Sequence, residues 1–133
     1  MRIFILLIFI FLFSCGSKTE NTPNKTSKPK WIYGAFEEKN AICGVGVSLP
    51  HIKGKAYQRA TAIARAIDEI ARQMKVKVDT KIEHFLKGSS SGRHSRISSF
   101  SVQTTTGQTV RAKIKDIYFN EETSELYVLM CTF

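Results

Sequence analysis

The sequence has few of the patterns that accompany metal binding, redox catalysis or membrane spanning. Its three cysteines include no Cys-x-x-Cys pair, the spacing typical of zinc ligands and thiol redox centres. Three histidines, His51, His84 and His94, have no mutual spacing that would indicate a metal site. The longest apolar run covers only residues 3–13, whereas a helix needs about 20 residues to span a bilayer. We therefore expect no cofactor, no metal and no helix that spans a membrane.

Acidic residues are also scarce, with 11 Asp and Glu against 20 Lys and Arg, which gives a formal net charge of +9. A basic excess of this size often indicates nucleic-acid binding. The export signal at the N-terminus argues against nucleic-acid binding, because an exported domain does not encounter cytoplasmic nucleic acid. Anionic lipid head groups, acidic polysaccharide or an acidic protein surface are the partners this charge favours. Solubility without a defined partner is the alternative.

The first fifteen residues have the organisation of an export signal. Arg2 is the only charged residue before Cys15, and the apolar run of residues 3–13 is followed by the small residue Ser14. An apolar core of about 10–14 residues fits a signal peptide rather than a membrane span. A signal anchor with an incidental cysteine is the alternative interpretation.

Residues 12–15, Leu-Phe-Ser-Cys, resemble the lipobox of bacterial lipoproteins, which has a leucine, two mostly small residues and an invariant cysteine. The resemblance implies that the Cys15 thiol receives diacylglycerol, that the chain is cut before Cys15, and that the new amine is acylated. Acyl chains contribute about 0.8 kcal/mol per buried methylene, so two or three chains anchor a protein stably where one does not. Gly16 stands where an aspartate often retains lipoproteins in the inner membrane, which favours the outer membrane.

This interpretation divides the chain into a signal peptide at residues 1–14, a lipidated cysteine and tether at 15–30, and a domain at 31–133. Cleavage would leave 119 of the 133 residues, with a formal charge of +8 once Arg2 is lost. That length suits one domain with a modest core. Residues 16–30 contain no large apolar side chain, so they are expected to form a flexible tether with a reach of about 20 Å.

Cys43 and Cys131 are the cysteines that remain once Cys15 is assigned to lipid. Both lie in stretches that are predicted to be strands, and oxidising compartments permit a disulfide between them. Two buried free thiols, which behave as small apolar groups, are the alternative.

Hydrophobic periodicity predicts an α+β domain. Apolar and β-branched residues 41–48 predict a strand, and apolar residues at three- and four-residue steps predict a long helix over 55–74 that begins near Gly54. Strict alternation over residues 76–83 predicts a second strand with one solvent-facing side. We expect one long helix packed on a curved, mainly antiparallel sheet of about four strands.

The C-terminal third is predicted to be a loop followed by further antiparallel strands. Residues 88–99 are rich in serine and glycine and indicate a mobile loop, while 100–110 are ambiguous with a strand-like start. Residues 112–119 and 126–133 form a predicted hairpin with its turn at 120–124, and Ala112, Ile114 and Asp116 are assigned to one strand face. Arg93 and Arg96 in the loop are candidates for contact with an acidic partner; a solvated loop is the alternative.

Several landmarks together resemble the LPP-twenty lipoprotein family. They are Pro-Lys-Trp-Ile at 29–32, Ile-Cys-Gly-Val-Gly at 42–46, the alanine- and arginine-rich stretch at 60–66, Val-Lys-Val at 76–78, Ile-Tyr at 117–118 and Leu-Tyr-Val-Leu at 126–129. The resemblance spans about the whole of the predicted domain. It implies a dodecin-like layout of a helix on an antiparallel sheet, an outer-membrane location, and no established catalytic site. The family includes surface antigens and the lipoprotein of a flagellar basal disk.

Motifs for catalysis are incomplete. Ser48 lies in Gly-Val-Ser-Leu-Pro, which fails the nucleophile-elbow pattern at its last residue. Gly44 and Gly46 lack the third glycine of a dinucleotide fingerprint and indicate close packing instead. Asp68 and Glu69 are adjacent on the predicted helix and do not face each other, while Asp68 and Arg72 are spaced to pair. The sequence therefore predicts a protein that is not an enzyme.

The function expected from these patterns is a membrane-anchored outer-membrane lipoprotein that faces the periplasm or the cell surface and works by assembly. Partners would be membrane lipid at Cys15 and further copies or other envelope proteins, in a surface or flagellum-associated complex. The alternative is a binding module for an acidic envelope ligand such as cell-wall polymer or lipopolysaccharide. Trp31, Tyr33 and Phe36 precede the first strand. We expect them to dock the chain onto the core, and a binding edge is the alternative.

Overall fold

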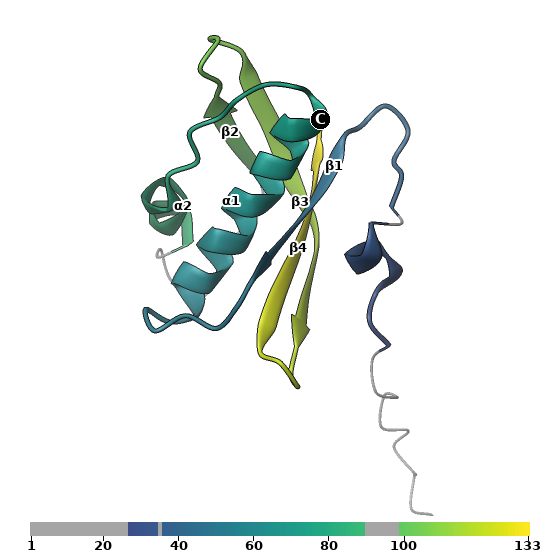
Figure 1. Cartoon of the computed structure of the whole chain (residues 1–133), viewed down its shortest axis with the longest axis vertical. Helices are drawn as coiled ribbons and strands as arrows, with labels where there is room; N and C mark the ends of the chain where they lie inside the picture. Colours follow the sequence, from purple (N-terminus) through teal and green to yellow (C-terminus); the bar gives the residue numbers. More distant parts are fainter. Residues whose placement is uncertain (1–26, 35, 90–98) are drawn as a thin grey trace, which may run out of the picture.

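The computed structural model of this chain describes residues 27–34, 36–89 and 99–133, which form an α+β domain. Its sheet has four antiparallel strands in the order β1-β4-β3-β2. The long helix α1 lies on one face of the sheet and a short 3-10 helix, η1, lies on the other side (Figure 1). The elements in chain order are η1 (Lys30–Tyr33), β1 (Cys43–Ser48), α1 (Lys55–Gln73), α2 (Ile82–Ser89), β2 (Ser99–Gln103), β3 (Thr109–Asn120) and β4 (Glu125–Thr132). The prediction of one long helix on a four-stranded antiparallel sheet is confirmed.

The helix α1 forms where the three- and four-residue spacing predicted it. Ile63, Ile67 and Ile70 point into the core and are almost wholly inaccessible to solvent. Gly54 precedes the first turn with φ of 91°, a conformation that side chains other than glycine rarely adopt. Burial of this apolar stripe against the strands stabilises the domain by about 25 cal/mol per Å² of apolar surface removed from water.

The contact between α1 and β1 is closer than side chains normally permit. A Cβ atom added to Gly46 would lie 1.8 Å from the carbonyl oxygen of Ala62, and one added to Gly44 would lie 2.5 Å from that of Ala66. Both collisions are with helix backbone, which cannot move aside as a flexible side chain can. Glycine in the strand and alanine in the helix are therefore a matched set that brings the two backbones together.

The strand β1 forms one edge of the sheet, and α1 covers part of its outer side. Arg65 Nη1 donates a hydrogen bond of 2.6 Å to the Val47 carbonyl, and Gln73 Nε2 donates one of 2.8 Å to the Cys43 carbonyl. Unpaired carbonyls on an edge strand can recruit a strand from another chain. The close helix therefore protects this edge at two of its outward-facing groups.

The predicted strand at residues 76–83 is wrong. Within this stretch only Val78 pairs with the sheet, through a single bridge to Thr104, and α2 begins at Ile82. The alternating Val76 and Val78 do pack against the core, and Thr80 Oγ1 donates a 2.6 Å hydrogen bond to Asp68 on α1. Alternation alone could not distinguish this extended connection from a strand.

The short helix α2 was not predicted, because its residues continue into the serine- and glycine-rich stretch that indicated a loop. Phe85 on α2 is buried and its ring packs edge-on against Phe100 of β2, with centroids 5.5 Å apart. Most of the predicted loop at 88–99 lies outside the described residues. Among the residues that are described, no helix is long and apolar enough to cross a membrane.

The predicted C-terminal hairpin is confirmed. β3 and β4 are joined by a turn over residues 121–124, and Ser124 adopts φ of 57° within it. The assignment of Asp116 to the same face as Ala112 and Ile114 is wrong. The register shifts between Ile114 and Asp116, so a bulge turns Asp116 to the side of the sheet that carries η1.

Replacing Gly46 with alanine should lower the free energy of unfolding by about 3 kcal/mol or more, because the added methyl group collides with the backbone of α1. Urea unfolding followed by circular dichroism measures the change. Ser101→Ala, at an exposed position of β2, is the control and should stay within about 0.5 kcal/mol of the parent. Equal stability of the two variants would show that α1 does not lie this close to β1.

Candidate functional site

The residues singled out from the sequence fall into two groups. Cys15, Arg93 and Arg96 lie outside the described residues, so the structure says nothing about their surroundings. Cys43 and Cys131 are described, and they lie next to each other on the face of the sheet opposite α1. That face, with η1 and the chain that follows it, holds the main cluster of polar and sulfur-containing side chains described below.

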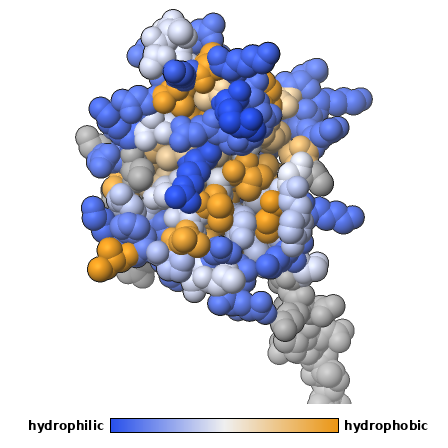
Figure 2. All heavy atoms as spheres, viewed as in Figure 1, coloured by the Kyte–Doolittle hydropathy of each residue, from blue (hydrophilic) through white to orange (hydrophobic). Residues whose placement is uncertain are grey.

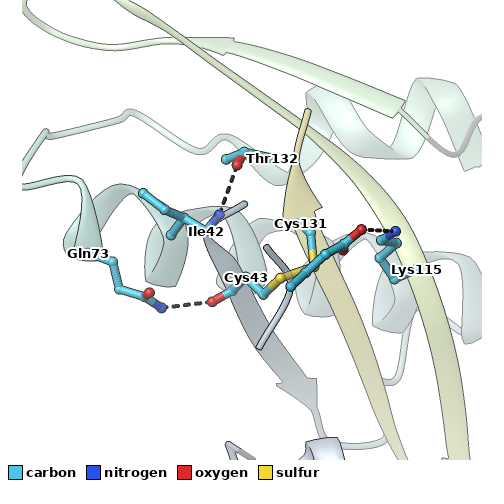
Figure 3. Close-up of a disulfide and its surroundings, with 7 residues drawn as sticks. Ile42, Cys43, Gln73, Lys115, Cys131 and Thr132 are labelled. Carbon is cyan, nitrogen blue, oxygen red and sulfur yellow. Dashed lines mark hydrogen bonds and ion pairs between the residues drawn. A yellow bond between two sulfur atoms is a disulfide. The ribbon is translucent and has the colours of Figure 1, made fainter. Parts of the chain in front are cut away.

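Cys43 and Cys131 form a disulfide that joins the edge strand β1 to its neighbour β4 (Figure 3). They are direct partners in the antiparallel register, with Cα atoms 4.1 Å apart. In the adjacent pair, the Thr132 amide donates to the Ile42 carbonyl at 2.9 Å, and the Ile42 amide donates to the Thr132 side-chain hydroxyl at 2.9 Å. The cysteines thus occupy a non-hydrogen-bonded pair, the position where opposing side chains approach most closely. The bond closes a loop with a sequence separation of 88 residues.

An ion pair lies beside the disulfide. Lys115 Nζ is 2.6 Å from Glu38 Oε1, and Glu38 Oε2 is buried without a hydrogen-bond partner. One carboxylate oxygen of Glu38 and the two sulfurs lie within 4.8 Å of one another, a grouping that could hold a metal only if both cysteines were thiolates. In the disulfide each sulfur is bonded to the other. The cluster therefore acts as a cross-link beside an ion pair, and sequence spacing gave no sign of Glu38 or Lys115.

Trp31 fixes η1 to the same face. Its side chain is only 7% exposed and packs against Leu129 and Cys131, and its Nε1 donates a 2.8 Å hydrogen bond to Asp116 Oδ2. Tyr33 is 73% exposed, so docking onto the core applies to Trp31 and not to the aromatic group as a whole. The bulge in β3 places Asp116 where it can accept this bond, and the sequence pattern did not reveal the bulge.

An open groove of about 440 Å³ runs between η1, β1 and the C-terminal part of α1. Trp31, Phe36 and Val45 contribute apolar surface, and Glu69 and Gln73 contribute polar groups from α1. Hydrogen bonds from Arg72 lower the pKa of Glu69, which keeps this carboxylate ionised and paired. The groove therefore combines apolar surface with a carboxylate whose charge is neutralised by Arg72.

Several polar side chains that the sequence analysis considered as candidate site residues form local contacts in the described part of the structure. Ser48 is buried and its Oγ donates to the Leu49 carbonyl at 3.1 Å, while the His51 ring stacks on Tyr57 with centroids 4.1 Å apart. The predicted pairing of Asp68 with Arg72 is wrong, because Arg72 pairs with Glu69 at 2.6 Å and Asp68 accepts from Thr80. Each of these side chains therefore takes part in a contact within the fold.

The start of the described chain lies near the hairpin end of the sheet. Hydrogen bonds from Tyr127 and Thr123 lower the pKa of Glu125, and the positive charge of Lys28 contributes in the same direction. Glu125 is the first residue of β4 and follows the turn at 121–124. The chain therefore enters the domain at this end before Trp31 docks on the sheet.

Comparison of this chain with protein-family models, with curated proteins and with solved structures finds no match. The resemblance to LPP-twenty lipoproteins stays a prediction from the sequence.

Replacing both Cys43 and Cys131 with alanine should lower the free energy of unfolding by about 2–4 kcal/mol, because the cross-link no longer restricts the unfolded chain. Urea unfolding with and without a dithiol reductant measures it. Reductant should destabilise the parent by a similar amount and leave the double variant unchanged. A parent that is insensitive to reductant would contradict a disulfide that stabilises the domain.

Proposed function

We propose that this protein is a non-enzymatic lipoprotein, anchored by lipid on Cys15 in the outer membrane, whose domain works by assembly or interaction in the cell envelope. The observation that carries the proposal is the order of residues 1–15: one positive charge, an apolar core too short to span a bilayer, and Leu-Phe-Ser-Cys. A surface complex or a flagellum-associated complex is the setting that the LPP-twenty resemblance suggests.

The composition of the next residues supports a tether. Residues 16–26 are polar or small, with no side chain that could build a core, and the first buried apolar side chain of the domain is Trp31. A coil over residues 16–29, which ends where η1 begins, would hold the domain about 20 Å from the lipid. The domain would then remain close enough to the bilayer to touch it and to meet other proteins anchored beside it.

The contacts of the described polar side chains favour interaction over catalysis. Ser48, Asp68 and Glu69 are each engaged in a hydrogen bond or ion pair that supports the fold. The groove beside η1 combines apolar surface with a polar rim, as protein contact surfaces commonly do. We infer that other envelope proteins or further copies of the chain are the partners.

Binding of an acidic envelope ligand is a second candidate, and a cluster on β3 favours it. The Arg111 guanidinium and the Lys113 ammonium each lie 5.9 Å from the centre of the Phe133 ring, which is largely exposed. Two cations beside an exposed aromatic ring could bind a polyanion such as lipopolysaccharide or cell-wall polymer.

Replacing Cys15 with serine should move the protein from the detergent phase to the aqueous phase, or block its maturation, because serine cannot form the thioether to diacylglycerol. Phase partition of cell extracts, with immunodetection, measures this. Ser14→Ala, which keeps a small residue before the cysteine, is the matched control and should partition like the parent. Normal maturation and detergent partition of the Cys15→Ser variant would contradict lipid anchoring.

Replacing Arg111 and Lys113 together with glutamine tests the second candidate. If the cluster binds a polyanion, affinity for purified lipopolysaccharide should fall about tenfold and should weaken as salt is raised. Lys77→Gln with Lys81→Gln, away from this face, is the control of equal charge. If neither added salt nor replacement of Arg111 and Lys113 changes the affinity, the cluster does not bind lipopolysaccharide as a polyanion.

A further inference from the structure

The loop between β1 and α1, residues 49–54, carries the most exposed apolar side chain among the described residues. Ile52 is 99% exposed and Leu49 is 62% exposed. Single exposed apolar residues are common on proteins, but here two lie three positions apart in one short loop. Figure 2 shows apolar atoms protruding at the lower left, the corner where this loop lies in Figure 1. The apolar tip stands clear of the rest of the surface.

The loop is held in a defined shape. The Gly54 amide donates to the His51 carbonyl at 2.9 Å and closes a turn with Ile52 in its middle. The Lys53 amide donates to His51 Nδ1 at 3.1 Å, and the His51 ring stacks on Tyr57 of α1. Because the turn is braced from both sides, Ile52 is presented outward rather than left free to fold back onto the domain.

Two lysines follow this tip in the sequence. Lys53 Nζ lies 5.0 Å from the centre of the Tyr57 ring, and Lys55 Nζ lies 5.6 Å from that of Phe119. Residues 49–57 include two lysines and no acidic residue. An apolar tip beside cations and aromatic rings is the combination that binds the interface of an anionic bilayer, where apolar groups enter the head-group region and cations meet lipid phosphates.

The loop lies at the end of the sheet where the chain enters the domain. Ser48, which precedes the loop, pairs with Leu126, and Gln58 Nε2 donates to the Ser124 carbonyl at 2.7 Å. Lys28 lies near Glu125 at the same end. A tether that joins the domain here would bring this end toward the membrane first, at a distance of about 20 Å or less.

We propose that the loop at residues 49–54 docks the domain onto the anionic surface of the membrane, with Ile52 entering the head-group region and Lys53 and Lys55 facing lipid phosphates. This inference rests on the proposed anchor at Cys15. Glu121 and Glu122 on the neighbouring hairpin turn are repelled by the same surface, so the contact is confined to the loop side of this end. The domain is thereby oriented, with the β2–β3 end pointing away from the bilayer.

The test places a tryptophan at the loop in the full mature protein. Ile52→Trp and the control Gln108→Trp, an exposed position on the β2–β3 connection, are each reconstituted into vesicles of anionic lipid with brominated acyl chains. Trp31 is present in both variants and provides a common background. Fluorescence of the Ile52→Trp protein should be quenched at least about twice as strongly as that of the Gln108→Trp protein. Adding Lys53→Gln and Lys55→Gln, or using zwitterionic vesicles, should reduce the difference.

Equal quenching of the two variants would overturn the docking proposal. A blue-shifted emission of Ile52→Trp that is already present without vesicles and is not quenched by brominated lipid would also overturn it, because it would mean that a second copy of the protein covers the loop. Phase partition of the same samples tests the anchor separately. Partition into detergent without selective quenching would support the lipid anchor and contradict the docking of the loop. Selective quenching of protein that partitions into the aqueous phase would support the docking and contradict the anchor.

Discussion

The close approach of α1 to β1 is the constraint on which the rest of the domain depends. With glycine at 44 and 46 the helix backbone lies directly on the strand. This position lets Arg65 and Gln73 reach around the edge of the sheet and bond the outward carbonyls of β1. The helix thus builds the core and protects an edge at the same time. Larger residues in either element would lift the helix and expose that edge to other strands.

Among the described residues, no comparable helix covers the second face of the sheet, and a few specific bonds hold the chain there. The disulfide ties β1 to β4, and Trp31 closes over Cys131 while its indole bonds to Asp116. These contacts fix the path of the chain from the hairpin end of the sheet to the start of β1. Under the proposed function, the face that holds the incoming chain also determines which end of the domain meets the membrane.

Long periodic segments were predictable from the sequence, and short ones were not. The apolar stripe of α1 and the C-terminal hairpin repeat often enough for periodicity to decide between helix and strand. Val76 and Val78 alternate like a strand, yet only Val78 forms a bridge, and Thr80 bonds to Asp68 on α1. The bulge that turns Asp116 around leaves no mark in the apolar pattern. Glu38 and Lys115 meet only through the tertiary fold, so spacing could not pair them.

The proposed lipid anchor rests on the sequence, and the proposed docking of the domain rests on its structure. Residues 1–15 have the pattern of a lipoprotein signal that ends at Cys15. The domain exposes Ile52, with two lysines beside it in the sequence, at the end of the sheet where the chain enters. The most direct measurement is the intact mass and N-terminal peptide of the protein purified from cell membranes. If the protein is an anchored lipoprotein, its chain begins at Cys15 and carries diacylglycerol on the thiol and a fatty acyl group on the amine. A chain that keeps residues 1–14, or that has an unmodified thiol at Cys15, would contradict it.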